Sequence, residues 1–266
     1  MNIKILQHTD IRLLPTVQPD GWSDIIPHFD FYTSSPFCFP IKVTIDDTIV
    51  GIGTTIIHHD VAWLAHIIVH KEYRKRGIGQ FITEALVEDA KSKNCETIYL
   101  LATDLGAPVY EKVGFETETE YLFFKEIKLG KSEKLLVNIE LYKEEFSEEV
   151  ERMDRIISSE VRMFHLKSHL PHGFVYKNNS SIDGFYFPTF GDGLILANTK
   201  SAGIALLQLH LQSNERVVFP KNNVAVKNYL NGKGFQEVLT GKRMRLGKKR
   251  DVKFENIYNR IGGNLG

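Results

Sequence analysis

The chain has 266 residues, 42% of them hydrophobic, which is enough for one large domain or two of ordinary size. Lysine plus arginine and aspartate plus glutamate both number 33, so the balanced charge argues against a dedicated nucleic-acid or membrane-surface binder. The only two cysteines, Cys38 and Cys95, do not form a Cys-x-x-Cys pair. The sequence shows no signal-peptide pattern, and no apolar run approaches 18 residues. We therefore expect a cytoplasmic protein with reduced thiols.

Hydrophobic periodicity indicates an alternation of strands and helices up to residue 124. In chain order the pattern predicts a strand at 3–6, mixed helical signals at 10–27, a hairpin of strands at 41–45 and 50–57, a strand at 61–69, an amphipathic helix at 77–93 and a strand at 97–102. A short helix should follow from Pro108 and end at Gly114, because proline suits the first turn and glycine the left-handed residue that ends a helix.

A basic, glycine-containing hexamer lies where the strand at 61–69 gives way to the helix at 77–93. It reads Arg74-Lys75-Arg76-Gly77-Ile78-Gly79. The first N–H groups of a helix carry partial positive charge, and glycine lets a phosphate approach them closely. The hexamer therefore predicts a pyrophosphate site, although a basic turn that merely ends a strand would read the same way.

Spacing separates this loop from other phosphate loops, since a Walker loop needs a later Gly-Lys-Ser/Thr and a dinucleotide fingerprint needs glycine where Ile82 stands. Arg-x-x-Gly-x-Gly between a strand and a helix resembles the coenzyme A loop of the GNAT superfamily of N-acyltransferases. A second segment, Tyr110-Glu111-Lys112-Val113-Gly114-Phe115, resembles the GNAT segment in which a short helix ends and the next strand begins. The resemblance covers residues 1 to about 125.

This resemblance implies an α/β (α+β) GNAT fold with a mixed central sheet flanked by helices, and acetyl-CoA (coenzyme A) as cofactor. The residues that it implies for cofactor binding are Ile67, Ile68, Val69, Arg74, Lys75, Arg76, Gly77, Ile78, Gly79, Thr103 and Gly106. Two departures are present. Thr103-Asp104 stands where many members carry Asn, and Leu101 stands where two-domain relatives often carry Asp.

Acyl transfer to an amine has three chemical requirements. The tetrahedral oxyanion needs preorganised donors, and the backbone N–H groups of 67–69 are the candidates. The departing thiolate needs a proton, and Tyr110 matches the family position of that acid; a tyrosine packed under the cofactor is the alternative. The amine must lose a proton, for which His66 is a candidate base or, alternatively, a core histidine. His58-His59-Asp60 reads as a solvated turn, so we expect no metal.

The second half repeats the first in outline. Leu230-Asn231-Gly232-Lys233-Gly234-Phe235 lies 120 residues after the Tyr110 segment (230 minus 110), and a charged helix or helix pair is expected over 142–170. No Arg-x-x-Gly-x-Gly follows the apolar run 193–197, although a helix is expected there. The pattern resembles a degenerate GNAT domain without a coenzyme A site; the alternative is a coincidence of common Gly-Phe pairs.

These observations predict a catalytic GNAT domain at 1–130 and a divergent GNAT-like domain at 131–266. The predicted function is transfer of an acetyl group from acetyl-CoA to a primary amine by direct attack. The acceptor could be a small molecule or a protein lysine or N-terminus, and the protein could form a homodimer. The rival interpretation is a non-catalytic acyl-CoA sensor, in which the pyrophosphate site still binds the cofactor but no acetyl group is transferred.

Overall fold

The computed structural model describes residues 1–129, 138–179 and 181–266, which cluster into two compact units. The first unit consists of residues 1–116, 244–249 and 263–265, and the second of 117–243, 250–262 and 266. The boundary that we expected near residue 130 lies outside the described residues. The division of roles between 1–130 and 131–266 stays a prediction.

The first unit follows the predicted order of elements. Its elements are β1 (Asn2–Ile5), a 3₁₀ helix (His8–Thr16), α1 (Ile26–Ser34), β2 (Cys38–Ile45), β3 (Thr48–His58), β4 (Val61–Val69), a 3₁₀ turn (Lys71–Tyr73), α2 (Ile78–Ser92), β5 (Thr97–Ala102) and α3 (Ala107–Val113). The helical signals at 10–27 resolve differently from a single helix, since α1 begins only at Ile26, with Pro27 in its first turn.

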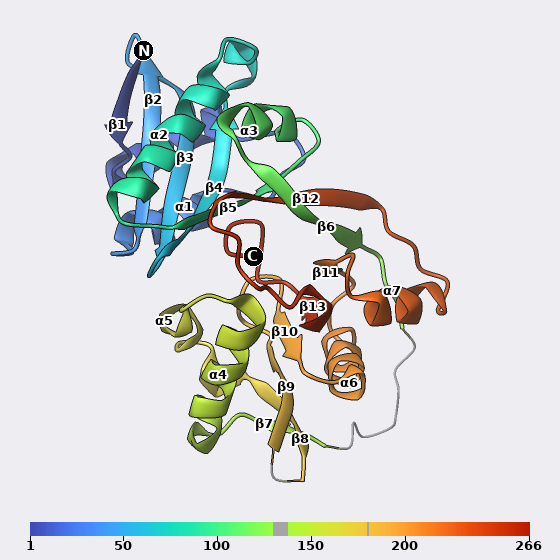
Figure 1. Ribbon diagram of the computed structural model, residues 1–266. Helices are drawn as coiled ribbons and strands as arrows, with labels where there is room; N and C mark the ends of the chain where they lie inside the picture. Colours follow the sequence, from blue (N-terminus) through green and yellow to red (C-terminus); the bar gives the residue numbers. More distant parts are fainter. Residues whose placement is uncertain (130–137, 180) are drawn as a thin grey trace. The chain divides into compact units, whose positions relative to one another are not determined.

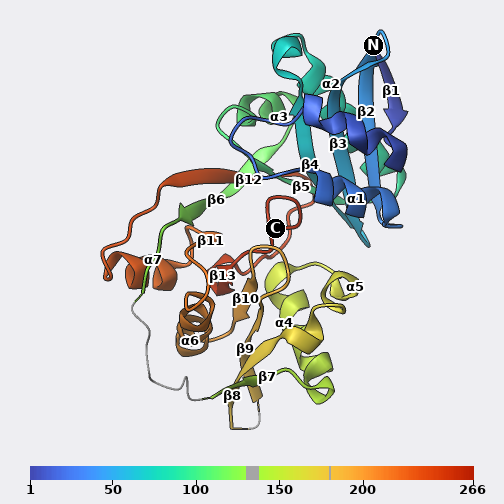
Figure 2. The same ribbon diagram turned by 180° about the vertical axis from the view of Figure 1, so that it is seen from behind.

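The sheet of the first unit runs β1-β2-β3-β4-β5, with antiparallel neighbours up to β4 and a parallel β4–β5 pair. Helix α2 lies across one face of β3 and β4, and α1 packs on the other side against β2 (Figures 1 and 2). A β-carbon at Gly53 would lie 2.8 Å from Leu86 of α2, so glycine permits the close approach of this helix. Val61–Val69 and Thr97–Ala102 match the predicted strands.

The second unit is built on a five-stranded antiparallel sheet of order β13-β10-β9-β8-β7. Helices α4 and α6 pack against β9 and β10, and Figure 1 shows them on opposite sides of that sheet. The elements that follow α3 are β6 (Glu116–Phe124), β7 (Ile139–Leu141), a 3₁₀ turn (Glu144–Phe146), α4 (Ser147–Ser158), α5 (Met163–Leu166), a 3₁₀ turn (Leu170–His172), β8 (Phe174–Asn178), β9 (Ser181–Phe187), β10 (Leu194–Ala197), α6 (Lys200–His210), β11 (Val217–Pro220), α7 (Val224–Asn231), β12 (Leu239–Gly247), a 3₁₀ turn (Phe254–Asn256) and β13 (Ile257–Asn259).

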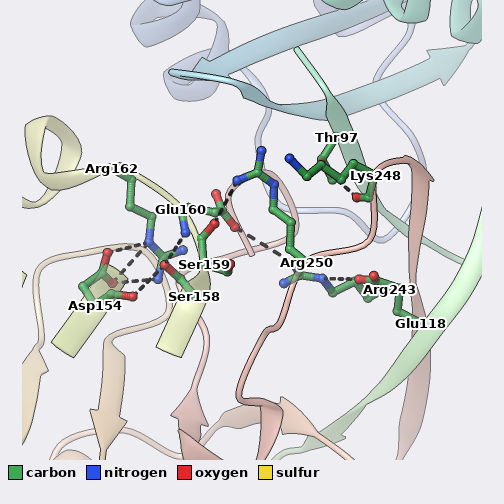
Figure 3. A network of polar contacts seen from close by, with 10 residues as sticks. All are labelled: Thr97, Glu118, Asp154, Ser158, Ser159, Glu160, Arg162, Arg243, Lys248 and Arg250. Carbon is green, nitrogen blue, oxygen red and sulfur yellow. Dashed lines mark hydrogen bonds and ion pairs between the residues drawn. The ribbon is translucent and has the colours of Figure 1, made fainter. Parts of the chain in front are cut away.

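The helix pair that we expected over 142–170 is present in shortened form. Helix α4 ends at Ser158 because Ser159 adopts a left-handed conformation with φ +59°, and the single-turn α5 follows. A buried ion pair ties the two together. The guanidinium of Arg162 donates to both carboxylate oxygens of Asp154, with Nη2 to Oδ1 at 2.9 Å (Figure 3). This bidentate contact fixes the α4–α5 connection inside the second unit.

The repeated segments end their helices with the same hydrogen bonds. The N–H of Phe115 donates to the carbonyl of Tyr110 at 3.0 Å, and 120 residues later the N–H of Phe235 donates to that of Leu230 at 3.1 Å. The N–H groups of Gly114 and Gly234 make the matching inner bonds, and both glycines have positive φ, +102° and +87°. These paired bonds form a Schellman motif at each site, so the sequence similarity reflects a repeated local structure.

Candidate active site

The basic hexamer forms the loop into α2, as predicted. Both of its arginines contact residues that precede the loop in the sequence. Nε of Arg74 donates to the carbonyl of Val69 at 3.1 Å, and the guanidinium of Arg76 lies 5.1 Å from the centre of the Tyr73 ring. Both side chains are exposed, and Arg74 commits one of its five N–H donors to this bond. The loop therefore presents two anchored guanidinium groups beside the start of a 15-residue helix.

The two glycines of the loop have different reasons to be glycine. Gly77 is the N-cap of α2 and has φ +80°, a conformation that a β-carbon would strain, and nothing lies within 4 Å of that position. Gly79 is helical, and a β-carbon there would meet Val69 at an ordinary 3.7 Å and Val109 at 4.0 Å. The fold itself thus tolerates alanine at 79. The space around the β-carbon position of Gly77 is empty, and N–H groups at a helix start such as this one are suited to bind a phosphate.

The edge of β4 next to the loop is open toward β5. The parallel ladder joins only 61–63 to 97–99, so the strands are not paired beyond Trp63. On the other edge, the N–H of His70 donates to Val50, and alternation along an antiparallel pair commits the amide of Ile68 to β3 and turns those of Ile67 and Val69 toward β5. Of the three predicted oxyanion donors, Ile67 and Val69 therefore have the suitable orientation.

A β-bulge places His66. The register between β3 and β4 shifts so that the pairs Ile52–Ile68 and Thr54–Ala65 enclose one extra residue on β4, and His66 has φ +48°. Ala62 and Leu64 belong to the core cluster under α2, and beyond the bulge Ile67 and Val69 pack against that same cluster. The alternation of faces thus slips by one residue. His66, which regular alternation would point at α2, instead faces α1.

The surroundings of His66 are aromatic and largely closed. Its ring centre lies 4.6 Å from that of His28, and its Nδ1 lies 2.9 Å from Oη of Tyr32, a residue of which 1% is exposed. Burial, with a smaller contribution from His28, lowers the pKa of His66 to about 3. The imidazole is therefore neutral at neutral pH, with one of its two ring nitrogens unprotonated, and it is a weak base.

Tyr110 lies on α3, with its ring packed over Gly106. A β-carbon at Gly106 would lie 2.9 Å from that ring, so only glycine leaves room for it. Burial raises the pKa of Tyr110 to about 12, which keeps the phenol protonated. The hydroxyl of Thr103 accepts from the N–H of Gly106 at 3.2 Å and so helps to start α3. Thr103 and Gly106 thus have local structural functions beside any contact with a ligand.

The structure brings together most of the predicted site residues in one part of the first unit. Gly79 joins the end of β4, through Val69, to α3, through Val109. Within the described residues no contact is recorded between His66, which faces α1, and Tyr110, which packs in the cluster beneath α2. One expectation is wrong: His58 is not part of a solvated turn but is fully buried at the end of β3, and His59 and Asp60 alone make the turn.

One side chain that contacts the site was not assigned to it from sequence. Tyr32 belongs to the aromatic run 29–32, which reads as a lining of the acceptor pocket or, alternatively, as core, whereas Asn264 lies 232 residues away from it in the chain. No local pattern connects positions so distant. The conformation of His66 was equally hidden, because a bulge leaves an apolar strand pattern almost unchanged.

Comparison with known proteins agrees with this geometry. Residues 5–115 match the model of the Acetyltransferase (GNAT) family. A structure from Pyrococcus horikoshii, described as an acetyltransferase, superposes over 100% of this chain and 95% of its own with a TM-score of 0.83 and 19% identity. A tandem GNAT protein from the clavulanic acid biosynthesis pathway covers 94% of this chain and 99% of its own, with a TM-score of 0.57 and 11% identity. At these identities the similarity shows the fold.

Curated relatives match parts of the first half. The [Ribosomal protein bS18]-alanine N-acetyltransferase of Salmonella typhimurium is 28% identical over 82 residues, which are 30% of this chain and 55% of that protein. The protein YyaT of Bacillus subtilis is 31% identical over 91 residues, 34% of this chain and 62% of its own length. The mouse cysteine-rich protein 2-binding protein is 28% identical over 88 residues, 32% of this chain and only 11% of that protein. This chain thus spans about a tenth of the mouse protein and between half and two thirds of each of the two bacterial proteins.

The match of residues 5–115 and the superpositions identify a GNAT acetyltransferase domain in the first half of the chain. The tandem GNAT protein, which superposes over 94% of this chain, shows that the fold similarity extends beyond that domain. Among the described helices, none combines the length and the apolar character needed to cross a bilayer.

Proposed function

We propose that this protein is an N-acetyltransferase that moves the acetyl group of acetyl-CoA to a primary amine by direct attack. The observation that carries the proposal is the juxtaposition of Gly79 with Val69, which sets an anion-binding helix start beside an open strand edge. Acetyl-CoA has a pyrophosphate between its adenosine and its pantetheine arm, and a thioester at the far end of that arm. A site for it must therefore combine phosphate donors with an extended surface for the arm between them.

The loop from Arg74 to Gly79 is the proposed pyrophosphate site. The amides at the start of α2 and the guanidinium groups of Arg74 and Arg76 supply the donors, and Lys75 and Ile78 complete the loop. Above it, the N–H groups of Ile67 and Val69 face the open edge. There they can pair with the pantetheine arm or with the thioester oxygen, whose negative charge grows as the amine adds.

The chemistry makes one C–N bond and breaks one C–S bond. The amine nitrogen attacks the thioester carbon, the ammonium so formed sheds a proton, and the sulfur departs as a thiolate that takes up a proton. Tyr110 is the proposed donor to the thiolate. Because its pKa is about 12, it can donate a hydrogen bond readily, whereas full transfer to a thiolate with a pKa near 8.5 is unfavourable in the free protein. His66 is the proposed group that receives the proton of the attacking nitrogen.

The proposed acceptor is a primary amine, carried either by a small molecule or by a protein. The ribosomal-protein alanine N-acetyltransferase by its name modifies a protein amine, and this favours a protein N-terminus as the second candidate acceptor beside a small amine. The aromatic side chains near His66 supply the wall on the acceptor side. Trp22, whose ring centre lies 6.4 Å from that of His66, is 47% exposed and can contact a bound acceptor.

The second half is proposed to bind no coenzyme A. The corresponding helix start, at α6, is closed by its own side chains: the hydroxyl of Thr199 accepts from the N–H of Ala202 at 3.3 Å. A β-carbon at Gly203, in the first turn of α6, would lie 2.1 Å from the ring of Tyr258, so that ring packs directly against the helix.

Binding of acetyl-CoA to the full chain by calorimetry tests this proposal. One site is expected, weakened at least tenfold by combining Arg74→Ala with Arg76→Ala, and unchanged by Lys200→Ala at the start of α6. Incubation with radiolabelled acetyl-CoA and panels of small amines and of peptides then separates the two acceptor classes. Tight binding without turnover in either panel would support the sensor interpretation instead. Absence of binding would remove the coenzyme A assignment for this chain.

A further inference from the structure

A chain of hydrogen bonds reaches His66 from the far end of the sequence. Nδ2 of Asn264 donates to Oη of Tyr32 at 2.9 Å, and that oxygen lies 2.9 Å from Nδ1 of His66. Asn264 belongs to the segment 263–265 that clusters with the first unit. Tyr32 is 1% exposed, so its hydroxyl depends on these partners rather than on bulk water.

The number of protons in this chain determines its direction. A phenol has one proton to donate. When Tyr32 accepts from Asn264, its own proton is directed to Nδ1 of His66, and a neutral imidazole that accepts at Nδ1 carries its hydrogen on Nε2. In this arrangement the outward nitrogen of His66 is a hydrogen-bond donor.

Turning the amide of Asn264 by 180° reverses the chain. Oδ1 would then accept from Tyr32, Tyr32 would accept from an Nδ1–H of His66, and Nε2 would carry a lone pair. Mixed arrangements either bring two protons together or leave the buried hydroxyl proton without an acceptor, which costs about 1–3 kcal/mol. The orientation of one amide is thus coupled to the tautomer of one imidazole.

We propose that Asn264, acting through Tyr32, sets the tautomer of His66 and is a positioning residue for acyl transfer. The inference rests on the proposed function, because it concerns the group that handles the proton of the attacking amine. With Asn264 as the donor, Nε2 of His66 already carries a hydrogen and cannot take up another. In the reversed chain Nε2 has a lone pair, so it can take up the proton of the attacking nitrogen. The imidazolium so formed donates from Nδ1 to Tyr32, which donates to Oδ1 of Asn264.

The direction of the Asn264–Tyr32–His66 hydrogen bonds is determined by these neutral groups themselves, because the titratable groups around them do not impose a direction. His28 of α1 faces His66, and burial lowers its pKa although Asp24 opposes this. Cys38 at the start of β2 lies near Tyr32, and burial raises the pKa of this thiol to about 11, so it is uncharged at neutral pH. The formal charge nearby is that of Asp24, which acts on His28.

Asn264→Asp gives the sharpest test, because a carboxylate can only accept. It should force Tyr32 to donate away from His66, move the imidazole hydrogen to Nδ1 and raise the pKa of His66. Asn264→Ala removes the amide without imposing a direction, so a tautomer mixture is expected. Nitrogen NMR of histidine-labelled protein without acetyl-CoA reports both the tautomer and the pKa, and the His66 signals are assigned by their loss in His66→Gln.

A matched background separates the proposed chain from a direct effect of charge. In Tyr32→Phe the chain is broken, so Asn264→Asp should no longer change the tautomer of His66. The proposal is overturned if the native protein and both Asn264 variants show the same His66 tautomer and pKa, or if Asn264→Asp acts equally well with Phe at 32. Thermal unfolding identifies any variant that does not fold. If the Asn264 variants do not fold, the proposal requires that Tyr32→Phe alone changes the tautomer of His66.

The kinetic consequence is a split between turnover and cofactor binding. Asn264→Ala should lower kcat by about tenfold, within the range of acid–base contributions, and leave the KM for acetyl-CoA unchanged. Because the NMR readout needs no turnover, a protein that proved inactive would refute the proposed function without deciding the tautomer. An unchanged kcat together with a changed tautomer would overturn the positioning role.

Discussion

Gly79 at the start of α2 lies directly beside Val69 at the end of β4, where a β-carbon on the glycine would be 3.7 Å from Cγ2 of the valine. That distance is ordinary van der Waals contact. The fold therefore gives no steric reason for glycine at 79. What remains is the space above the helix start, which a β-carbon would narrow for an approaching phosphate.

Gly79→Ala is predicted to leave the free protein as stable as before, or up to about 1 kcal/mol more stable, since alanine favours a helix over glycine. Acetyl-CoA affinity should nevertheless fall at least tenfold. Thermal unfolding and calorimetric titration of the same samples measure the two effects. The matched control is Gly77→Ala, which has φ +80° and should lose about 1 kcal/mol of stability. Unchanged affinity in Gly79→Ala would show that no ligand approaches this amide.

Tyr110→Phe is predicted to reduce kcat by about 10²-fold or more while acetyl-CoA binding stays within a factor of about three. The phenol is proposed to act on the departing thiolate, so the deficit should shrink for a thioester whose thiol has a lower pKa. Comparing kcat for such an acyl donor and for acetyl-CoA in the native protein and the variant measures this. An equal deficit for both donors would assign Tyr110 to packing beneath the ligand.

The pH dependence of kcat/KM should follow the ionisation of the acceptor. The pKa of His66 is about 3 and that of Tyr110 about 12, so neither group titrates between pH 6 and 9. For an alkylamine with a pKa near 10.4, kcat/KM should rise about tenfold per pH unit across that range. A plateau that begins near pH 7 would instead reveal another protein base with a neutral pKa.

Protein stability should depend on His66 at acid pH. Its folded pKa of about 3 lies below the unfolded value of 6.5, so between these values the unfolded state binds the additional proton. Stability is therefore complete above about pH 6.5 and falls as the pH drops toward 3, by at most about 1.4 kcal/mol per unit from this group. Denaturant unfolding of the native protein and of His66→Gln should show a shallower slope in the variant. Equal slopes would mean that the ring is not desolvated.

Asp154→Ala should destabilise the protein by about 3–5 kcal/mol, because it leaves Arg162 buried without its carboxylate. The two side chains are 3% and 5% exposed, so water cannot replace the partner. Below the unfolding temperature, acetyl-CoA affinity should remain unchanged, since the ion pair belongs to the second unit. The exposed pair Lys143–Glu140 provides the control, where Lys143→Ala should cost less than about 1 kcal/mol. A loss of affinity in folded Asp154→Ala would refute the division of roles.

The sequence predicted what short-range patterns determine. The strands at 61–69 and 97–102 and the turn at Gly114 follow from apolar runs and from a glycine in a left-handed position, which are local features. The loop into α2 was predictable for the same reason, and its binding of phosphate stays a prediction. The start of α1 was less so, since Pro27 marks a first turn only once the preceding residues are known to be extended or irregular.

Long-range features escaped prediction. Whether His66 faces α1 or α2 depends on a single extra residue opposite Gly53, and the buried position of His58 depends on neighbouring strands. The assignment of segments to units could not be predicted either. Residues 244–249 belong to the first unit although more than a hundred residues separate them from β5 in the sequence. Such contacts leave no periodic signal in the intervening chain.

The interleaving of the two units constrains how the protein is made. Residues 244–249 and 263–265 belong to the first unit, so a ribosome that has synthesised residues 1–116 has not yet supplied every part of it. The last of these segments emerges only after residues 117–243 and 250–262 of the second unit have been translated. An exchange of the first unit between genes by one cut at its apparent end would leave these segments behind. Residues 1–116 therefore form a complete first unit only when the segments 244–249 and 263–265 are present with them.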